Sequence, residues 1–293
     1  MNPNHQVLRY LCSSCNNLII ETYKVIDWTE ITSSEECPKC GSLLSSQTIT
    51  TSTAQQTMVQ KPLLRPKFQT ASRLCFDIEK IDSVLNLEIS DRVCIVGNHS
   101  KTLVERLIIS SLLPESHGGF GSENVIIIDA GNCSDVYRCV NLARQYGLDI
   151  KNILKRIIVS RPFTIYQLEE LAVNELPKVM KKFDAKTIIV SDILHLFLND
   201  PQVKFVEAKN ILKPIINSIH QFSRISLNVI VVSFHTDVPS GYSRFLFSNF
   251  NKFIQTTACN SDRIMMKVNS CKEDCKTLHL QQKELELIQQ GQG

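Results

Sequence analysis

The sequence lacks a long hydrophobic segment and a strong charge bias, and its first residues do not show the pattern of a secretory leader. No apolar run approaches the roughly 20 residues that a membrane-spanning helix needs, which argues against an integral membrane protein. The first residues, MNPNHQVLRYLC, hold neither a long apolar region nor a small-residue cleavage site, so we expect a cytoplasmic protein. The formal net charge of +3 neither requires nor excludes a nucleic-acid partner, because a basic patch can exist within a nearly neutral total.

The composition fits a folded protein with reduced thiols. Hydrophobic residues make up 43% of the 293 residues, which is enough for a packed core and argues against wholesale disorder. This length accommodates one large domain, or a small domain followed by a medium one. The 11 cysteines are an odd number, and in a cytoplasmic protein we expect free or metal-bound thiols rather than a disulfide framework.

Four cysteines near the N-terminus form two Cys-x-x-Cys pairs, Cys12 with Cys15 and Cys37 with Cys40. Two such pairs can bring four thiolates onto one tetrahedral zinc ion. A module of about 40 residues buries too little apolar surface to fold without such support. We therefore predict a zinc ribbon over residues 1–45 with these four cysteines as metal ligands, and leave open whether it contacts DNA or protein.

A polar segment and then an α/β pattern follow the ribbon. Residues 46–70 are rich in Ser, Thr and Gln and predict a flexible linker. Beyond residue 71, β-branched runs alternate with helix-length amphipathic stretches, which predicts an α/β fold with a mostly parallel sheet covered on both faces. The expected strands are 93–97, 124–130, 156–161, 187–192 and 228–234, and the expected helices are 101–113, 134–147, 164–183 and 203–225. Residues 252–258 and 263–270 predict a C-terminal β-hairpin, and 281–293 a frayed end.

The order of these elements resembles the RecA/RadA recombinase family, and archaeal RadA and RadB with their degenerate paralogues most of all. RLCFDIEKIDSVLNLEISDRVCIVG resembles the entry to the family's ATPase core, and NVIIIDAGNCSDVYRCVNLARQYGLDIKNILKRIIVSR its next unit. TIIVSDIL resembles the Walker B strand, and NVIVVSFHT the strand that carries the polar sensor. The resemblance implies a RecA-like P-loop NTPase core over 71–293, ATP with Mg²⁺ as cofactor, and a role in DNA recombination and repair. It also implies association with a recombinase or with further copies of the chain.

The candidate nucleotide-binding residues are Gly97, Ser100, Lys101 and Thr102. A GxxxxGK[ST] loop wraps the β-phosphate in backbone N–H groups, while its lysine and hydroxyl contact phosphate and magnesium. Here two residues are missing after the first glycine, and Ser100 stands where the second glycine belongs. The alternative is an ordinary strand–turn–helix connection with Ser100 as the N-cap.

Three further positions depart from the family pattern. The family's water-activating glutamate corresponds to Gly131, which cannot act as a base. Ser191 ends the Walker B run where the aspartate belongs, and a one-residue shift to Asp192 turns a strand side chain to the opposite face. The sensor pair is Phe234-His235, so Asp192 and His235 are only vestigial candidates. We therefore expect that ATP hydrolysis is lost.

Candidate contacts with single-stranded DNA are Lys204, Tyr242 and Arg244, which lie in the segments that correspond to the family's two DNA-binding loops. Charge and aromatic stacking would carry this binding. Phe68 and Ala71 match the Phe-x-x-Ala motif by which recombinase protomers dock into a neighbour.

Three functions stay open. The first is a catalytically degenerate recombinase paralogue that acts as an accessory or mediator factor. The second is an active DNA-dependent or KaiC-like ATPase with an atypical P-loop. The third is a zinc-ribbon protein-interaction module without a direct DNA role.

Overall fold

The computed structural model describes the backbone of residues 5–11, 18–24, 29–30, 73–225, 228–234, 240–259, 263–270 and 273–286. Side chains are described from residue 73 onward, apart from a few at the borders of these ranges. The predicted linker over 46–70 lies outside the described residues. Among the described helices, none is long and apolar enough to cross a membrane.

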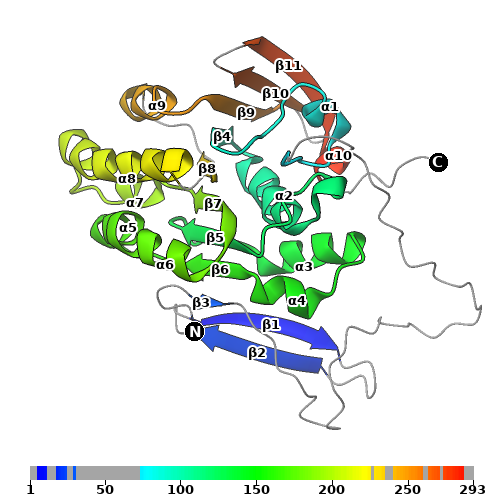
Figure 1. Ribbon diagram of the computed structural model, residues 1–293. Helices are drawn as coiled ribbons and strands as arrows, with labels where there is room; N and C mark the ends of the chain where they lie inside the picture. The colour runs from blue at the N-terminus through cyan, green and yellow to red at the C-terminus, as the bar shows by residue number, and fades with distance from the viewer. Residues whose placement is uncertain are drawn as a thin grey trace, which may run out of the picture.

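A mixed sheet forms the centre of the described core (Figure 1), with the strand order β11-β10-β9-β4-β8-β7-β5-β6-β3. Its strands are β3 (Thr29–Glu30), β4 (Arg92–Gly97), β5 (Asn124–Asp129), β6 (Ile157–Ser160), β7 (Ala185–Ser191), β8 (Val229–Phe234), β9 (Lys252–Ala258), β10 (Arg263–Ser270) and β11 (Glu273–Gln281). The strands from β9 to β6 run parallel, whereas β3, β10 and β11 pair antiparallel with their neighbours. A separate pair is formed by β1 (His5–Leu11) and β2 (Leu18–Lys24).

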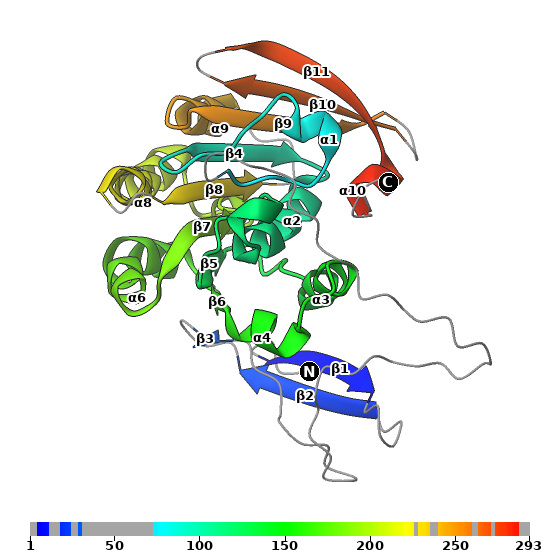
Figure 2. The ribbon, with the colours of Figure 1, turned by 45° about the vertical axis from the view of Figure 1, so that its right-hand side comes forward.

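Helices cover both faces of the sheet (Figure 2). One face carries α2 (Ser100–Leu112), α3 (Val136–Gln145) and α4 (Ile150–Lys155), and the other carries α5 (Ile165–Glu170), α6 (Leu176–Lys182) and α8 (Phe205–Ile225). Shorter helices are α1 (Glu79–Asp82), α7 (His195–Leu198), α9 (Ser240–Phe247) and α10 (Gln282–Glu286). Successive residues of β5 alternate between two hydrophobic cores, because strand side chains point to opposite faces in turn. This arrangement confirms the predicted α/β class with a mostly parallel sheet.

The helices differ from the prediction in two places: α4 is an additional short helix, and the predicted helix over 164–183 is interrupted. Gly147, with a φ of 66°, follows the end of α3, and the carboxylate of Asp149 accepts the Lys151 N–H at 3.0 Å to cap α4. The predicted helix over 164–183 contains a π-helical turn, Leu171–Glu175, immediately before α6. Pro177 lies in the first turn of α6 and has no N–H to continue the α-helical ladder.

The C-terminal end differs from the prediction. The expected hairpin is present as β9 and β10, but β11 extends it and α10 follows. The expectation of a frayed end is therefore wrong for residues 281–286, and Leu285 is buried. Arg106 of α2 holds this end, because its guanidinium donates to the carbonyls of Leu285 at 2.8 Å, Glu284 at 3.2 Å and Phe76 at 3.2 Å. These hydrogen bonds also attach α2 to the C-terminal end of the core. The first turn of α2 comes directly after the short turn that follows β4.

Candidate functional site

A two-residue turn, Asn98 and His99, joins β4 to α2. Gly97 has a φ of 107°, and a Cβ added there would lie 2.0 Å from the carbonyl oxygen of Thr256 in β9. The backbone N–H of His99 donates to Thr256 Oγ1 at 3.1 Å, and that hydroxyl donates to the Val96 carbonyl at 3.2 Å. The end of β4 is thus packed directly onto β9. A phosphate cradle needs a longer run of amides that face the ligand, so this turn does not fit ATP and Mg²⁺ bound in the P-loop manner.

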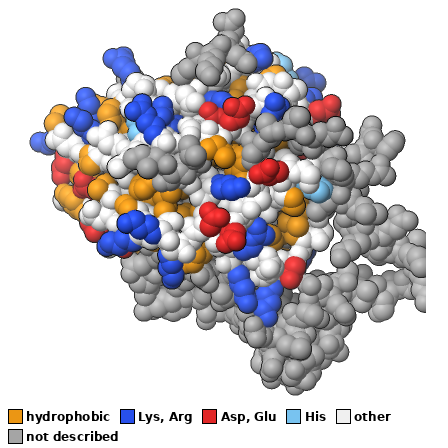
Figure 3. Space-filling view, viewed as in Figure 1, with side chains coloured by type: hydrophobic (Ala, Val, Ile, Leu, Met, Phe, Trp, Pro, Cys, Tyr) orange, Lys and Arg blue, Asp and Glu red, His pale blue; other side chains and the backbone are white. Residues whose placement is uncertain are grey.

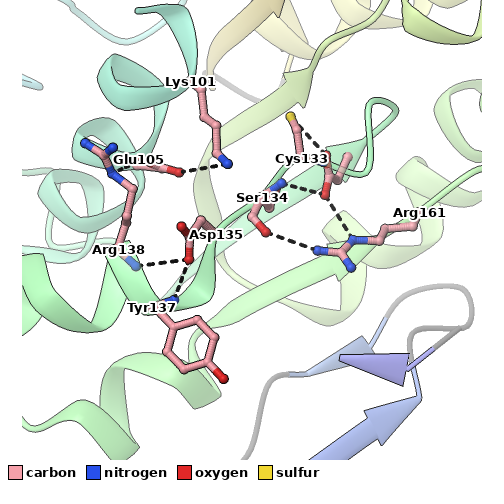
Figure 4. Close-up of polar contacts among 9 residues, drawn as sticks. Lys101, Glu105, Cys133, Ser134, Asp135, Tyr137, Arg138 and Arg161 are labelled. Atoms are coloured by element: carbon pink, nitrogen blue, oxygen red, sulfur yellow. Dashed lines mark hydrogen bonds and ion pairs between the residues drawn. The ribbon is translucent and has the colours of Figure 1, made fainter. Parts of the chain in front are cut away.

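The four candidate nucleotide-binding residues all lie at this turn, and they differ in burial. Ser100 is the first residue of α2 and is buried, whereas the N-cap is His99 and makes no side-chain cap. Thr102 is half-buried in the same turn of helix. The Lys101 ammonium lies 4.0 Å from the carboxylate of Glu105, one helical turn further along (Figure 4).

Glu105 is the unexpected charged group of this region. It is buried in α2, and its carboxylate lies 2.8 Å from Nε of Arg138 in α3. Burial raises the pKa of Glu105 to about 7, although the charges of Arg138 and Lys101 act in the opposite direction. The signal in the sequence was a glutamate between apolar residues in LVERLIISSLL, where a charge on the buried side of a helix requires a partner.

Asp129, at the end of β5, is completely buried and organises the turn that follows. Its carboxylate accepts the N–H groups of Cys133 and Ser134, both at 3.0 Å, and lies 2.9 Å from Nε of Arg161. Figure 4 labels these three partners. Burial and then the charges of Asp129 and Asp192 raise the pKa of the Cys133 thiol to about 12. The Cys133 side chain is therefore a protonated thiol at neutral pH and not a nucleophile.

The two departures at Gly131 and Asp192 meet in space. A Cβ at Gly131 would lie 2.6 Å from Cβ and 2.7 Å from Oδ2 of Asp192. Ser191 ends β7 opposite Asp129, and Asp192 then takes a left-handed backbone conformation with a φ of 50°. This conformation directs its buried carboxylate into the volume that a side chain at residue 131 would occupy. A glutamate at residue 131 does not fit beside Asp192.

Two groups from neighbouring elements lie close to Asp192. Its Oδ2 lies 3.4 Å from Nδ1 of His195 in α7, and its backbone N–H donates to the Ser233 hydroxyl at 3.4 Å. In the sequence, the missing glutamate at residue 131 and the shifted aspartate at residue 192 are two separate departures from the family pattern. No local sequence pattern connects positions that follow different strands. The structure brings them together at the carboxyl edge of β5 and β7.

The three candidate DNA-binding residues differ in their exposure to solvent. Lys204 and Arg244 are exposed, whereas Tyr242 is only 6% exposed and its ring packs edge-to-face on Phe205 with 4.8 Å between centroids. Phe234, at the predicted sensor position, is also buried.

The remaining predicted site residues lie outside the described part of the chain. They are His235, the docking-motif residues Phe68 and Ala71, and the zinc ligands Cys12, Cys15, Cys37 and Cys40. Among the described residues, no group of three or more His, Cys, Asp or Glu side chains is placed to hold a metal ion.

A comparison with protein-family models gives a match to Rad51 over residues 93–236. The matched segment begins in β4 and ends just beyond β8, so it contains the strands that carry every departure described above. Its position agrees with the parallel sheet and with the helices on both faces. The match and the fold together support the assignment of this segment to the RecA/RadA superfamily.

Proposed function

We propose that this chain is a catalytically inactive RecA/RadA-type protein that acts as an accessory or mediator factor in DNA recombination and repair. The Rad51 match supports a RecA-family role in recombination and repair, and with it association with a recombinase or with copies of the chain. The proposed loss of hydrolysis rests on the geometry of the site. The proposed accessory role follows from that loss.

The observation that carries the proposal is the contact between Gly131 and Asp192. ATP hydrolysis in this superfamily needs a base to position the attacking water and a carboxylate to hold the magnesium shell. Here a glycine replaces the base, and the Asp192 side chain fills the space beside that glycine. The packing of Gly97 on Thr256 supports the same conclusion independently, since it ties the short turn after β4 directly to β9.

The test is a Mg²⁺-dependent ATPase assay on the full chain, with and without single-stranded DNA, beside the variant Lys101→Ala. We expect no turnover above that of Lys101→Ala under either condition. Hydrolysis that Lys101→Ala removes would instead establish the active ATPase with an atypical loop.

We further propose that Cys12, Cys15, Cys37 and Cys40 hold one structural zinc ion. Four thiolates form the donor set that zinc prefers, and such a site needs no open coordination position. Metal analysis of the purified chain should find zinc at about one equivalent. The double variant Cys37→Ser/Cys40→Ser should lose it, whereas Cys259→Ser, at an exposed free thiol of the core, should retain it. Equal zinc in all three proteins would contradict the assignment.

A further inference from the structure

Exposed large apolar side chains are concentrated on one part of the described surface. Five of them lie at the N-terminal ends of α5 and α8 and in α7, and we call them the α5–α8 patch: Phe163, Tyr166, Leu198, Phe205 and Val206. Val206 is 70% exposed and Tyr166 is 61% exposed. A monomeric soluble protein scatters such residues singly, so a cluster of five indicates a surface that binds something.

Two members of the patch, Tyr166 and Phe205, are held in place by contacts within the fold. The Tyr166 hydroxyl donates to the carboxylate of Glu207 at 3.0 Å, which connects α5 to the first turn of α8. The Phe205 ring packs on Tyr242 and lies over Gly241, where an added Cβ would come within 2.9 Å of the ring. A partner would therefore meet side chains that are already positioned, which lowers the entropy cost of binding.

Three acidic groups lie near Tyr166 in the patch. Glu207, through its hydrogen bond and charge, and then Asp200 and Glu169 raise the pKa of the Tyr166 hydroxyl. In Figure 3, hydrophobic, acidic and basic side chains lie next to one another at the left edge of the molecule, where Figure 1 places α5, α7 and α8. Two basic residues, Lys204 and Lys209, are also exposed here, directly before Phe205 and one helical turn after it.

We propose that the α5–α8 patch docks an apolar protein segment that carries lysine or arginine. The aromatic and aliphatic side chains would cover the apolar side of that segment, and the carboxylates around Tyr166 would meet its cations. The same carboxylates oppose a nucleic-acid strand, because its phosphates would approach them closely. This inference goes beyond the recombination role, since it holds whether or not the core contacts DNA.

The experiment measures binding of the full chain to three fluorescent probes. These are a synthetic amphipathic peptide of leucine and lysine, a matched peptide of leucine and glutamate, and oligo(dT). The patch variant is Tyr166→Ser/Val206→Asn, at two exposed positions whose change leaves the core intact. A rim variant is Glu169→Gln/Asp200→Asn. Tyr137→Ser is the matched control, because Tyr137 is also exposed but lies on α3 outside the patch.

We expect the lysine peptide to bind and the glutamate peptide not to bind. Affinity for the lysine peptide should fall about tenfold or more in the patch variant and also fall in the rim variant, with no change in Tyr137→Ser. Absence of lysine-peptide binding, or an equal loss in Tyr137→Ser, overturns the proposal. It is also overturned if the patch variant abolishes binding of oligo(dT), or if it abolishes self-association of the chain, since the occupant would then be nucleic acid or a second copy.

Discussion

Glu105 should make the stability of this protein depend on pH between about 4.5 and about 7. Its pKa is raised, so the folded state binds this proton more tightly than the unfolded chain does. The stability that this difference provides is fully present below pH 4.5 and is lost as the pH rises through the folded-state pKa of about 7. Each pKa unit is worth about 1.4 kcal/mol, so the ionised Glu105 costs at most about 3 kcal/mol above neutral pH.

The variant Glu105→Gln keeps the shape of the side chain and removes this proton equilibrium. Relative to the unchanged protein, its free energy of unfolding should rise between pH 5 and pH 8, by up to about 3 kcal/mol. Urea unfolding at several pH values measures this difference directly. The matched control is Glu175→Gln, because Glu175 forms a surface ion pair with Lys178 at 2.6 Å and such pairs contribute little.

Two results would refute this reasoning. If the difference between Glu105→Gln and the unchanged protein does not vary with pH, burial does not dominate the proton equilibrium of Glu105. If the difference falls as the pH rises, the attraction between Glu105 and Arg138 outweighs desolvation, and the sign of the argument is wrong.

Three further predictions concern the core and its surface. Gly131→Ala should destabilise the fold by about 1–3 kcal/mol, and the loss should largely disappear when Asp192→Gly is also present, which a double-mutant cycle measures. Arg106→Met should cost about 3 kcal/mol in urea unfolding, because carbonyls near both ends of the core lose their donors. If the exposed Lys204 and Arg244 contact the phosphates of single-stranded DNA, replacing either by alanine should weaken DNA binding. The slope of the logarithm of the binding constant against the logarithm of the salt concentration should also fall by about one. Unchanged binding in both variants would show that neither residue belongs to a DNA-binding surface.

The strands of the parallel sheet were predictable because they are buried on both faces. The runs around Ile126 and Ile188 read as continuous β-branched sequence, and each forms a strand within one or two residues of the expected bounds. The edge strand β11 was not predictable in this way. Its sequence, EDCKTLHLQ, is mostly polar, and it forms by pairing with β10 and burying Leu280 against the core.

The chemical departures at the site were visible in the sequence, but their relation was not. A missing glutamate at residue 131 and a shifted aspartate at residue 192 can each be read from the order of residues. Their contact depends on the left-handed backbone of Asp192 and on the pairing of β5 with β7, which are properties of the folded sheet. The burial of Tyr242 under Phe205 has the same origin, since the two residues come from different helices.

The close contacts at Gly97 and at Gly131 differ in kind. At Gly97 the obstacle is backbone, because the Thr256 carbonyl occupies the space above the glycine. At Gly131 the obstacle is the Asp192 side chain, whose direction follows from a strained backbone angle. A glutamate restored at residue 131 would collide with Asp192, and a longer loop after Gly97 would still have to separate β4 from β9. Under the proposed loss of hydrolysis, neither change alone should restore activity, because each leaves the other close contact in place.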